Sequence, residues 1–515
     1  MSTKGIKRDT EWNSVLTQVK RQIPEAFDSD GDVLNLIYGN WCAPGHRRPY
    51  ISALDGTMLG GYPMIDLETT VGAVHFAANE FEHWSKIDLQ ERQRLVSQCL
   101  SEIRAQRDLL SHLLVWEIGK PLPQAQASVD RCLSGVEWYL EHIEGMLQNR
   151  LPLGLVSNIA SWNYPLSVLV HAILVQVLAG NSVIAKTASA GGVFAISLCL
   201  GIARRIGLPV SLVSGNGGRL SDALVKNQHI ACLAFVGGKS NGGDVAANLY
   251  DRSKRYILEM EGLNAYGIWD FSDWSSLAQQ IRKAFEYGKQ RCTAYPRFVV
   301  KRDHFARFLE TYLPVIESVR FGHPLLVADP LDAVPPLDFG PLINSNKVEE
   351  LTVRLSEAKG KGAVPLFEGK FREELFLPGQ DISSYFPPCA LMNIPRNCSL
   401  YHREPFGPID SLVVVDTLEE MVNEMNVSGG SLVASIATDD PKVALRIRRE
   451  VRAFKVGVNV LRSRGDRDEL FGGVGQSWKG CFVGGIHLVR AITYGPADDK
   501  LYGNFPEHVL MPETN

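Results

Sequence analysis

The segment KQRCTAYPR, residues 289–297, places Cys292 next to a cation, Arg291, between a helix-like run and the strand-like run FVV. Cysteine is often a small buried apolar residue, so packing is one interpretation. The alternative is a catalytic thiolate, because a neighbouring positive charge lowers the pKa of a thiol, and Arg291 supplies such a charge. The residues that accompany Cys292 decide between the two interpretations.

Two further polar residues lie at the ends of predicted strands. Asn163 belongs to SWNYPL and Glu259 to RYILEMEGLN. An asparagine at a strand end is commonly a turn former or a helix cap, but an amide N–H that faces a bound carbonyl stabilises an oxyanion. A glutamate there is commonly exposed, but a carboxylate near an apolar site can act as a general base. Both residues are therefore candidates for carbonyl chemistry together with Cys292.

Two glycine-rich turns follow strand-like runs and open helices, GNGGRLSDA at residues 215–223 and FVGGKSNGGDVAANL at residues 235–249. Such turns either let a helix approach a sheet closely or present backbone N–H groups to a phosphate. Lys186 ends the run NSVIAK, and ligands of open α/β sheets bind at the carboxyl ends of strands. The lysine favours a phosphate-bearing ligand at these turns.

The elements that must position these residues form two series. Residues 66–118 and 123–148 carry apolar residues at helical spacing, and from residue 151 short β-branched runs alternate with helical segments. This alternation is typical of a parallel sheet wrapped by crossover helices. A second alternation begins at YGIWDF and continues to VGVNVL, residues 456–461. The sequence therefore predicts an α/β protein with two doubly wound domains.

Composition limits the partners that the chain can have. Among 515 residues, 53 basic and 57 acidic side chains give a net charge of -4, which does not favour nucleic acid or an acidic membrane. The nine cysteines have neither the density of a disulfide scaffold nor the spacing of a metal site. The polar N-terminus predicts no secretory signal, and the apolar run 165–180 is too short to span a membrane. We expect a cytoplasmic protein that acts on small molecules without a metal.

Nine motifs, taken in order, resemble the aldehyde dehydrogenase superfamily over about residues 35–495. They are WNYPL, KTAS, FVGG, LEMEGLN, QRCTAYPR, YFPP, EPFGPI, VGVN and FGG. The resemblance implies two Rossmann-like domains. It assigns residues 1–128 and 150–258 to an NAD(P)-binding domain, residues 259–475 to a catalytic domain, and residues 129–149 and 476–515 to a bridging, oligomerising part and tail.

The resemblance also implies roles for the catalytic candidates. The thiolate of Cys292 attacks an aldehyde, and the side chain of Asn163 with the backbone N–H of Cys292 holds the oxyanion. After oxidation, the carboxylate of Glu259 activates the water that releases a carboxylic acid. Interpreted in this way, Cys292 is a nucleophile rather than a packing residue.

For the cofactor, the resemblance places Lys186 at the adenosine ribose and Glu404 at the nicotinamide ribose. Relatives that prefer NAD commonly carry a glutamate where this chain has Ser189, and a small neutral residue leaves NADP acceptable as well as NAD. The implied cofactor residues are Trp162, Lys186, Ser189, Gly237, Gly238, Lys239, Glu404 and Phe406.

The chain departs from the superfamily in several places. Gly238 replaces a serine, which leaves Lys239 as the nearest group for a pyrophosphate, and Lys289 replaces a glycine before Gln290. The excursion of roughly twenty residues through which relatives pair across subunits is reduced to LQNRLP. An exposed edge needs a partner or a cover. We therefore expect a homo-oligomer, a dimer, of altered geometry.

The loop that follows Asn459, VLRSRGDRDELF, borders the substrate tunnel by resemblance. Its Arg462 and Arg464, together with Arg291, suggest a substrate that carries a carboxylate, because arginine binds carboxylates bidentately. The other interpretation is a solvated loop balanced by its own acidic residues. Two rival functions also remain open. One is a non-catalytic binding or structural protein of the same fold, and the other is an enzyme that passes the acyl group to coenzyme A.

Overall fold

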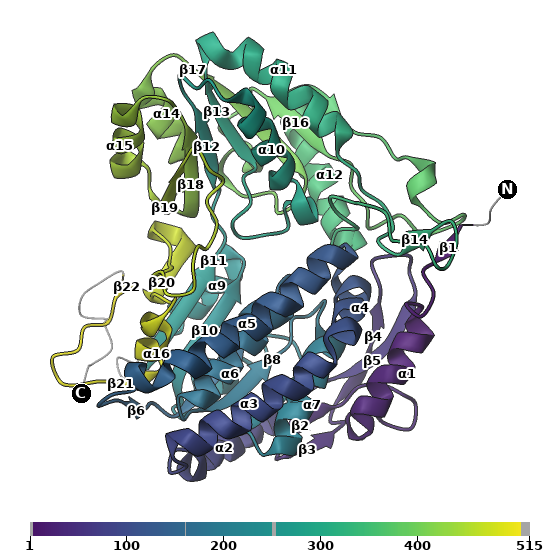
Figure 1. Cartoon of the computed structure of the whole chain (residues 1–515), viewed down its shortest axis with the longest axis vertical. Coiled ribbons are helices and arrows are strands. Elements are labelled where there is room, and N and C mark those ends of the chain that lie inside the picture. The colour runs from purple at the N-terminus through teal and green to yellow at the C-terminus, as the bar shows by residue number, and fades with distance from the viewer. Residues whose placement is uncertain (1–3, 160, 250–253, 506–515) are drawn as a thin grey trace.

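The computed structural model describes residues 4–159, 161–249 and 254–505. Two α/β domains face each other, each built on one large sheet (Figure 1). The first sheet has nine strands in the order β22-β20-β11-β10-β7-β8-β9-β2-β3, and the second has seven in the order β15-β16-β17-β13-β12-β18-β19. This arrangement confirms the predicted fold class of two doubly wound domains.

The N-terminal part is helical apart from short strands and one hairpin. The helices predicted within residues 66–118 and 123–148 are confirmed, with breaks where Asp66 and Asp88 cap new helices through side-chain hydrogen bonds to Thr69 and Glu91. The elements are β1 (Gly5–Ile6), α1 (Trp12–Gln22), β2 (Asn35–Ile37), β3 (Asn40–Cys42), the hairpin β4 (His46–Ile51) and β5 (Met58–Met64), α2 (Leu67–Trp84), α3 (Leu89–Ala105), α4 (Arg107–Ile118) and α5 (Leu122–Met146).

The first sheet has a parallel centre. The β-branched runs become β7 (Leu155–Ile159), β8 (Ser182–Lys186), β9 (Val210–Val213), β10 (Ile230–Gly237) and β11 (Arg255–Met260), connected by α6 (His171–Leu178), α7 (Val193–Ile206), α8 (Ser221–Leu224) and α9 (Lys239–Ala247). Strand order reverses between the neighbours β7 and β10. Ligands of open α/β sheets bind at such a switch point, beyond the carboxyl ends of the strands.

Both faces of this sheet are buried. Val183 and Ala185 of β8 pack with helices α6 and α7, whereas Ile184 between them packs with α2 on the opposite face. Successive side chains of a strand point to opposite faces, so a strand covered on both sides is continuously apolar. This is why NSVIAK and its neighbours have no alternating pattern. The apolar run 165–180 contributes the largely buried helix α6.

The second sheet is wrapped in the same way. Tyr266 and Phe298 pack with α10 and α11, whereas Ala265 and Val299 pack with α14 and α15 on the other face. Its elements are β12 (Ala265–Ile268), α10 (Trp274–Ala284), β13 (Arg297–Lys301), α11 (Arg302–Ser318), β14 (Leu326–Val327), α12 (Ser345–Gly360), β15 (Val364–Glu368), β16 (Cys389–Met392), α13 (Ser399–His402), β17 (Ile409–Val415), α14 (Leu418–Met425), β18 (Ser431–Ala437), α15 (Pro441–Glu450) and β19 (Ala453–Val458).

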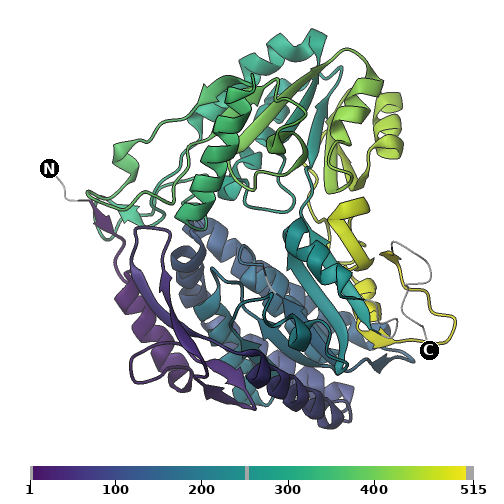
Figure 2. The same cartoon turned by 180° about the vertical axis from the view of Figure 1, so that it is seen from behind.

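After β19 the chain returns to the first domain. β20 (Trp478–Cys481) pairs antiparallel with β11, and β22 (Gly503–Asn504) pairs with β20, so the yellow C-terminal strands lie beside β11 in Figure 2. Between them are α16 (Ile486–Ala491) and β21 (Thr493–Tyr494). β21 pairs with β6 (Leu151–Pro152), and this two-stranded ribbon is all that stands at the position of the shortened excursion.

Three structural facts bear on the other sequence predictions. Strand β11 runs through the predicted domain boundary at residue 259, and helix α5 runs through the boundary at residue 129. Within the described residues, no helix combines the length and the apolar character needed to cross a bilayer. Of the predicted C-terminal tail, residues 506–515 lie outside the described residues.

Candidate active site

The structure brings the three predicted catalytic residues together between the domains. Cys292 lies in the loop before β13, Glu259 lies near the end of β11, and Asn163 follows β7. The Glu259 carboxylate lies near enough to the Cys292 thiol to raise the pKa of that thiol. The Asn163 amide donates to the carbonyl oxygen of Gln290 over 3.0 Å, two positions before the cysteine. The residues predicted to act as nucleophile, base and oxyanion donor therefore lie close together.

The loop that carries Cys292 is held by side-chain amides at its backbone. Asn264 donates to the carbonyl oxygens of Cys292 (2.8 Å) and Ala294 (2.7 Å). The side chain of Gln290 accepts from the backbone N–H of Ile343 (3.1 Å) and donates to the carbonyl oxygen of Pro341 (3.2 Å). Because these contacts come from both sides of the loop, they fix the backbone that carries the sulfur.

The electrostatics of the thiol differ from the sequence prediction. Burial raises the pKa of Cys292 well above its ordinary value, the Glu259 and Glu404 carboxylates raise it further, and Arg464 opposes them. The expected lowering by Arg291 is therefore wrong. The Arg291 guanidinium instead donates to the carbonyl oxygens of Lys283 and Ala284 and contacts Glu286 at 3.3 Å. In the protein without ligands, Cys292 is therefore a protonated thiol near the Glu259 carboxylate.

A cavity of about 60 Å³ adjoins Glu259. Apolar residues form most of its lining, with Ser161, Tyr164, His171 and Glu259 among the polar ones, and a volume of this size holds a few water molecules. Burial lowers the pKa of His171 to about 3, with smaller contributions from Arg464 and Arg467, so this imidazole is neutral near pH 7. The cavity gives water a place next to the carboxylate.

At the switch point of the first sheet, Lys186 ends β8 as predicted. The lysine is buried, its Nζ donates to the carbonyl oxygen of Thr187 (2.8 Å), and burial followed by the charge of Arg48 lowers its pKa to about 8. The exposed Ser189 accepts a hydrogen bond from Tyr62 at its carbonyl oxygen (2.9 Å). Arg48 lies opposite Tyr62 in the β4–β5 hairpin. Two cations and a small polar residue therefore share this corner.

The second glycine turn has the predicted form. Gly237 ends β10, and Gly238 in extended conformation is the N-cap of α9. The Nζ of Lys239 donates to the carbonyl oxygen of Ser428 (3.2 Å) and lies near the carboxylates of Glu261 and Glu404. In the described structure this lysine is thus engaged by its own protein rather than extended toward a ligand.

Glu404 is the clearest sign of a missing partner. The residue is only 5% exposed, yet within the described residues neither carboxylate oxygen has a hydrogen-bond partner. Burial, followed by Glu261, raises its pKa well above the ordinary value. Ribose hydroxyls would satisfy both oxygens, so this residue fits a nicotinamide dinucleotide. Phe406 packs edge-on against Trp162 with ring centroids 5.8 Å apart, as the resemblance implied.

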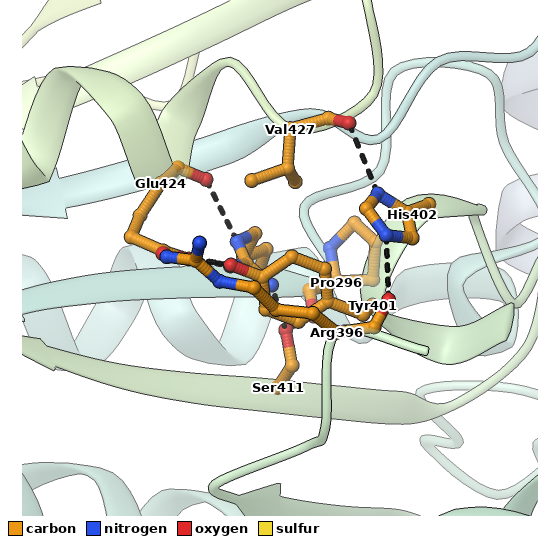
Figure 3. Close-up of polar contacts among 8 residues, drawn as sticks. Pro296, Arg396, Tyr401, His402, Ser411, Glu424 and Val427 are labelled. Carbon is orange, nitrogen blue, oxygen red and sulfur yellow. Dashed lines mark hydrogen bonds and ion pairs between the residues drawn. The ribbon is translucent and has the colours of Figure 1, made fainter. Parts of the chain in front are cut away.

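The short helix α13 before Glu404 is tied to the strand that follows the cysteine loop. Its Tyr401 donates to both carboxylate oxygens of Glu424 (2.7 and 2.8 Å), which also form an ion pair with Arg297. Figure 3 shows Tyr401 and Glu424 in this cluster, with His402 between the carbonyl oxygens of Arg396 and Val427. The contacts fix the approach of the chain to Glu404.

Four cations surround Tyr164 and Cys292. Arg131 and Arg291 act on Tyr164, Arg464 acts on Cys292, and the ammonium of Lys120 lies 3.9 Å from the Tyr164 ring centroid. Lys120 is 2% exposed, and among the described residues none of Lys120, Arg131 and Arg464 has a carboxylate within ion-pair distance. Burial, followed by the charges of Arg131 and Arg291, lowers the pKa of Lys120 well below its ordinary value, so the three arginines supply the positive charge on the side facing Tyr164.

Of the two arginines predicted in the substrate loop, only Arg464 is available. Arg462 forms an ion pair with Glu469, which also binds Lys455 at 2.7 Å. Sequence reasoning missed Arg48, Lys120 and Arg131, which lie far from the cysteine in the chain. The only signal that could have pointed to Lys120 is its place at a helix junction, in the run IGKPL.

The fold and the site define the class of this protein. A switch-point cleft suited to a dinucleotide faces a cysteine with an adjacent base and an amide donor, an arrangement that oxidises carbonyl compounds through a covalent intermediate. The family model described as the aldehyde dehydrogenase family matches residues 41–494. The chain belongs to this family and is an NAD(P)-dependent aldehyde dehydrogenase.

Individual relatives have low sequence identity to this chain but align with most of its length. The D-glyceraldehyde dehydrogenase (NADP(+)) of Picrophilus torridus is 24% identical over 447 residues, 82% of this chain and 87% of that protein. The alpha-ketoglutaric semialdehyde dehydrogenase of Bacillus subtilis is 25% identical over 468 residues, 86% and 93%. The solved NADP-dependent glyceraldehyde-3-phosphate dehydrogenase of Bacillus halodurans, complexed with NADP, superposes with a TM-score of 0.80 at 24% identity, covering 90% of this chain and 98% of that one.

Proposed function

We propose that this aldehyde dehydrogenase acts on an aldehyde that carries a carboxylate, which is bound by Arg131, Arg291 and Arg464. The observation that carries the proposal is the gathering of these cations around Tyr164 and Cys292. The buried Nε of Arg291 has no partner among the described residues, and an anion would supply one. The name of the semialdehyde dehydrogenase of Bacillus subtilis supports this substrate class.

The catalytic steps follow from the contacts of the chain. The thiol of Cys292 loses its proton to water, the sulfur forms a bond to the aldehyde carbon, and the oxyanion is held by the Asn163 amide and the Cys292 backbone N–H. Lys186, Glu404 and Phe406 would hold a nicotinamide dinucleotide, which would supply the two-electron acceptor that turns the thiohemiacetal into a thioester. Glu259 then takes a proton from water in the adjacent cavity, the water oxygen bonds to the acyl carbon, and the C–S bond breaks, so that the acid leaves and Glu259 returns the proton to the Cys292 sulfur.

For the nucleotide we infer a preference for NADP. Lys186 and Arg48 place two positive charges beside Ser189, and a 2′-phosphate carries the negative charge that would complement them. A glutamate at position 189 would repel such a phosphate, and this chain has none there. The complex of the Bacillus halodurans enzyme with NADP supports the inference.

A substrate panel tests the anion site. Succinate semialdehyde should have a kcat/KM at least tenfold higher than a neutral aldehyde of similar length, because one charge-assisted contact is worth about 1.5–3 kcal/mol. Glyceraldehyde 3-phosphate in the same panel distinguishes a phosphate site from a carboxylate site. Arg464→Met should remove the preference; activity toward the neutral aldehyde should fall by less, because the Arg464 charge also lowers the pKa of Cys292. A neutral long-chain aldehyde that performs best would contradict the proposal.

The same assay distinguishes hydrolysis of the thioester from transfer of the acyl group to coenzyme A. Addition of coenzyme A should leave the rate and the acid product unchanged, because Glu259 and its cavity serve water. Formation of an acyl-coenzyme A would instead support the acyl-transferring alternative.

Assembly, compartment and domain division remain proposals. We propose a homodimer, since the exposed edge strand β19 and the short ribbon β6–β21 offer strand edges to a second copy. A cytoplasmic location is supported by nine free cysteines. We also propose the division into domains at residues 128, 150, 258 and 475, with the boundary strand β11 shared. Sedimentation of the purified protein tests the dimer.

A further inference from the structure

Lys289, which stands where relatives of this family carry a glycine, has an unusual backbone. Tyr287, Gly288 and Lys289 all have left-handed conformations, with φ of 57°, 58° and 59°. A side chain other than glycine in this region costs roughly 1 kcal/mol or more, and glycine would adopt it without that cost. The lysine must therefore make contacts that a glycine at this position could not make.

The side chain of Lys289 is buried, and its ammonium group contacts both the cysteine loop and a carboxylate outside it. The ammonium lies 2.7 Å from Oδ1 of Asp410, donates to the carbonyl oxygen of Tyr295 over 2.9 Å, and lies 4.2 Å from the ring centroid of Phe285. The side chain of Lys289 is 1% exposed and that of Asp410 is fully buried. The other carboxylate oxygen of Asp410 accepts from the Tyr312 hydroxyl over 2.7 Å.

The contact with Tyr295 closes a loop in the chain. Residues 289 and 295 are its two ends, and Cys292 lies midway between them. Asp410 in turn belongs to β17, the strand that begins directly after the Glu404 and Phe406 segment. One ammonium group therefore joins both ends of the nucleophile loop to the strand that continues from the cofactor segment.

We propose that Lys289 is a positioning residue, which holds the Cys292 sulfur in register with the Asn163 amide and the Glu404 segment by bridging Tyr295 and Asp410. The role rests on the proposed function of Cys292 as nucleophile. It is distinct from a contribution to stability alone. The bond to Tyr295 shapes the loop, whereas the ion pair with Asp410 neutralises the buried charge.

Paired variants separate the two contributions. Lys289→Met alone leaves the Asp410 carboxylate buried without its cation and should lower the melting temperature strongly. Lys289→Met combined with Asp410→Asn removes both charges, and neutral replacement of a buried ion pair is commonly tolerated. The double variant should therefore melt close to the unchanged protein. Its burst of reduced nicotinamide should nevertheless be about 100-fold slower, because displacement of a reacting group by 1 Å costs that much.

Tyr312→Phe is the matched control. It removes a hydrogen bond from the same carboxylate and leaves the bond between Lys289 and Tyr295 intact. We expect a lower melting temperature with a burst rate within about twofold of the unchanged protein. Alkylation of Cys292 by iodoacetamide, which needs no cofactor, should slow in the double variant and stay unchanged in Tyr312→Phe.

Two outcomes would overturn the proposal. One is a double variant that recovers both the melting temperature and the burst rate, since Lys289 would then serve stability alone. The other is a loss of folding in every Lys289 variant, Lys289→Arg included, since the residue would then determine folding and not position. Cys292→Ala distinguishes a failure of the underlying function: activity that persists in this variant would refute the nucleophile itself, whatever the Lys289 variants do.

Discussion

The nucleophile loop, residues 289–295, and the cofactor segment that carries Glu404 differ in whether their buried polar groups have hydrogen-bond partners. In the loop, the carbonyl oxygens of Gln290, Cys292, Ala294 and Tyr295 all accept hydrogen bonds from buried side chains. In the cofactor segment, by contrast, both carboxylate oxygens of Glu404 lack hydrogen-bond partners in the described part of the chain.

The difference indicates which region the protein completes by itself. Unsatisfied buried polar groups cost free energy, so a folded chain keeps them only where a ligand will supply the partner or where strain serves a function. The loop is therefore organised before any ligand binds, whereas Glu404 in the cofactor segment gains its hydrogen-bond partners only from the dinucleotide. The following predictions test this contrast, from the largest expected effect to the smallest.

Glu259→Gln should give the largest loss of turnover, on the order of 10³-fold, because a general base for water is removed. The burst of reduced nicotinamide should persist. Glu259 raises the pKa of Cys292, so its neutralisation lowers that pKa and increases the thiolate fraction at pH 7. Alkylation of the free protein by iodoacetamide should consequently become faster. An unchanged steady-state turnover number would remove the glutamate from the proposed mechanism.

Asn163→Ala should slow the burst by about 10²-fold, equivalent to roughly 3 kcal/mol of barrier, through loss of an oxyanion donor. The variant also frees the Gln290 carbonyl, and so it tests how far the loop depends on its amide contacts. Rapid-mixing absorbance gives the rate, and NADP affinity should be unaffected. A normal burst rate would show that this amide serves the loop alone.

Arg48→Ala should raise the Kd for NADP about tenfold and leave that for NAD unchanged, because one charge-assisted contact with the 2′-phosphate is lost. Calorimetric titration measures both values without turnover. Arg47→Ala, whose guanidinium is paired with Asp28, is the neighbouring control. Equal weakening of both nucleotides would place Arg48 away from the phosphate.

Glu404→Gln should have the smallest effect of the four substitutions. It should increase the stability of the free protein, whereas the other three reduce activity or nucleotide affinity. Burial raises the pKa of this carboxyl in the folded state, so stability is lost as pH rises from the unfolded value of about 4.3 through the folded value. The amide removes that loss, and the free protein should become more stable by about 1 kcal/mol or more near pH 8. Nicotinamide cofactor binding should weaken. A lower melting temperature would show that the carboxylate already has a partner.

The sequence predicted the parts of the site that lie at strand ends. Asn163, Lys186 and Glu259 follow recognisable strands, and Cys292 stands in a distinctive motif, so their meeting follows from the topology of a doubly wound sheet. The direction of Arg291 could not be predicted, because it depends on carbonyl groups at the end of α10.

Contacts that join distant segments were also beyond prediction. Arg48 approaches Lys186 through the β4–β5 hairpin, and Lys289 meets a carboxylate 121 positions further along the chain. The sequence showed only that Lys289 replaces a glycine. Neither the burial of its ammonium nor its partner has a local pattern.

The return of the chain through β20 makes the two domains doubly connected. The backbone leaves the first sheet after Met260 and re-enters it at Trp478, so everything between these residues is inserted into one continuous structure. A protease that cut a single connection would not release either half. The cleft between the sheets is consequently spanned by two backbone segments, which restrict twisting of one domain against the other more than a single linker would.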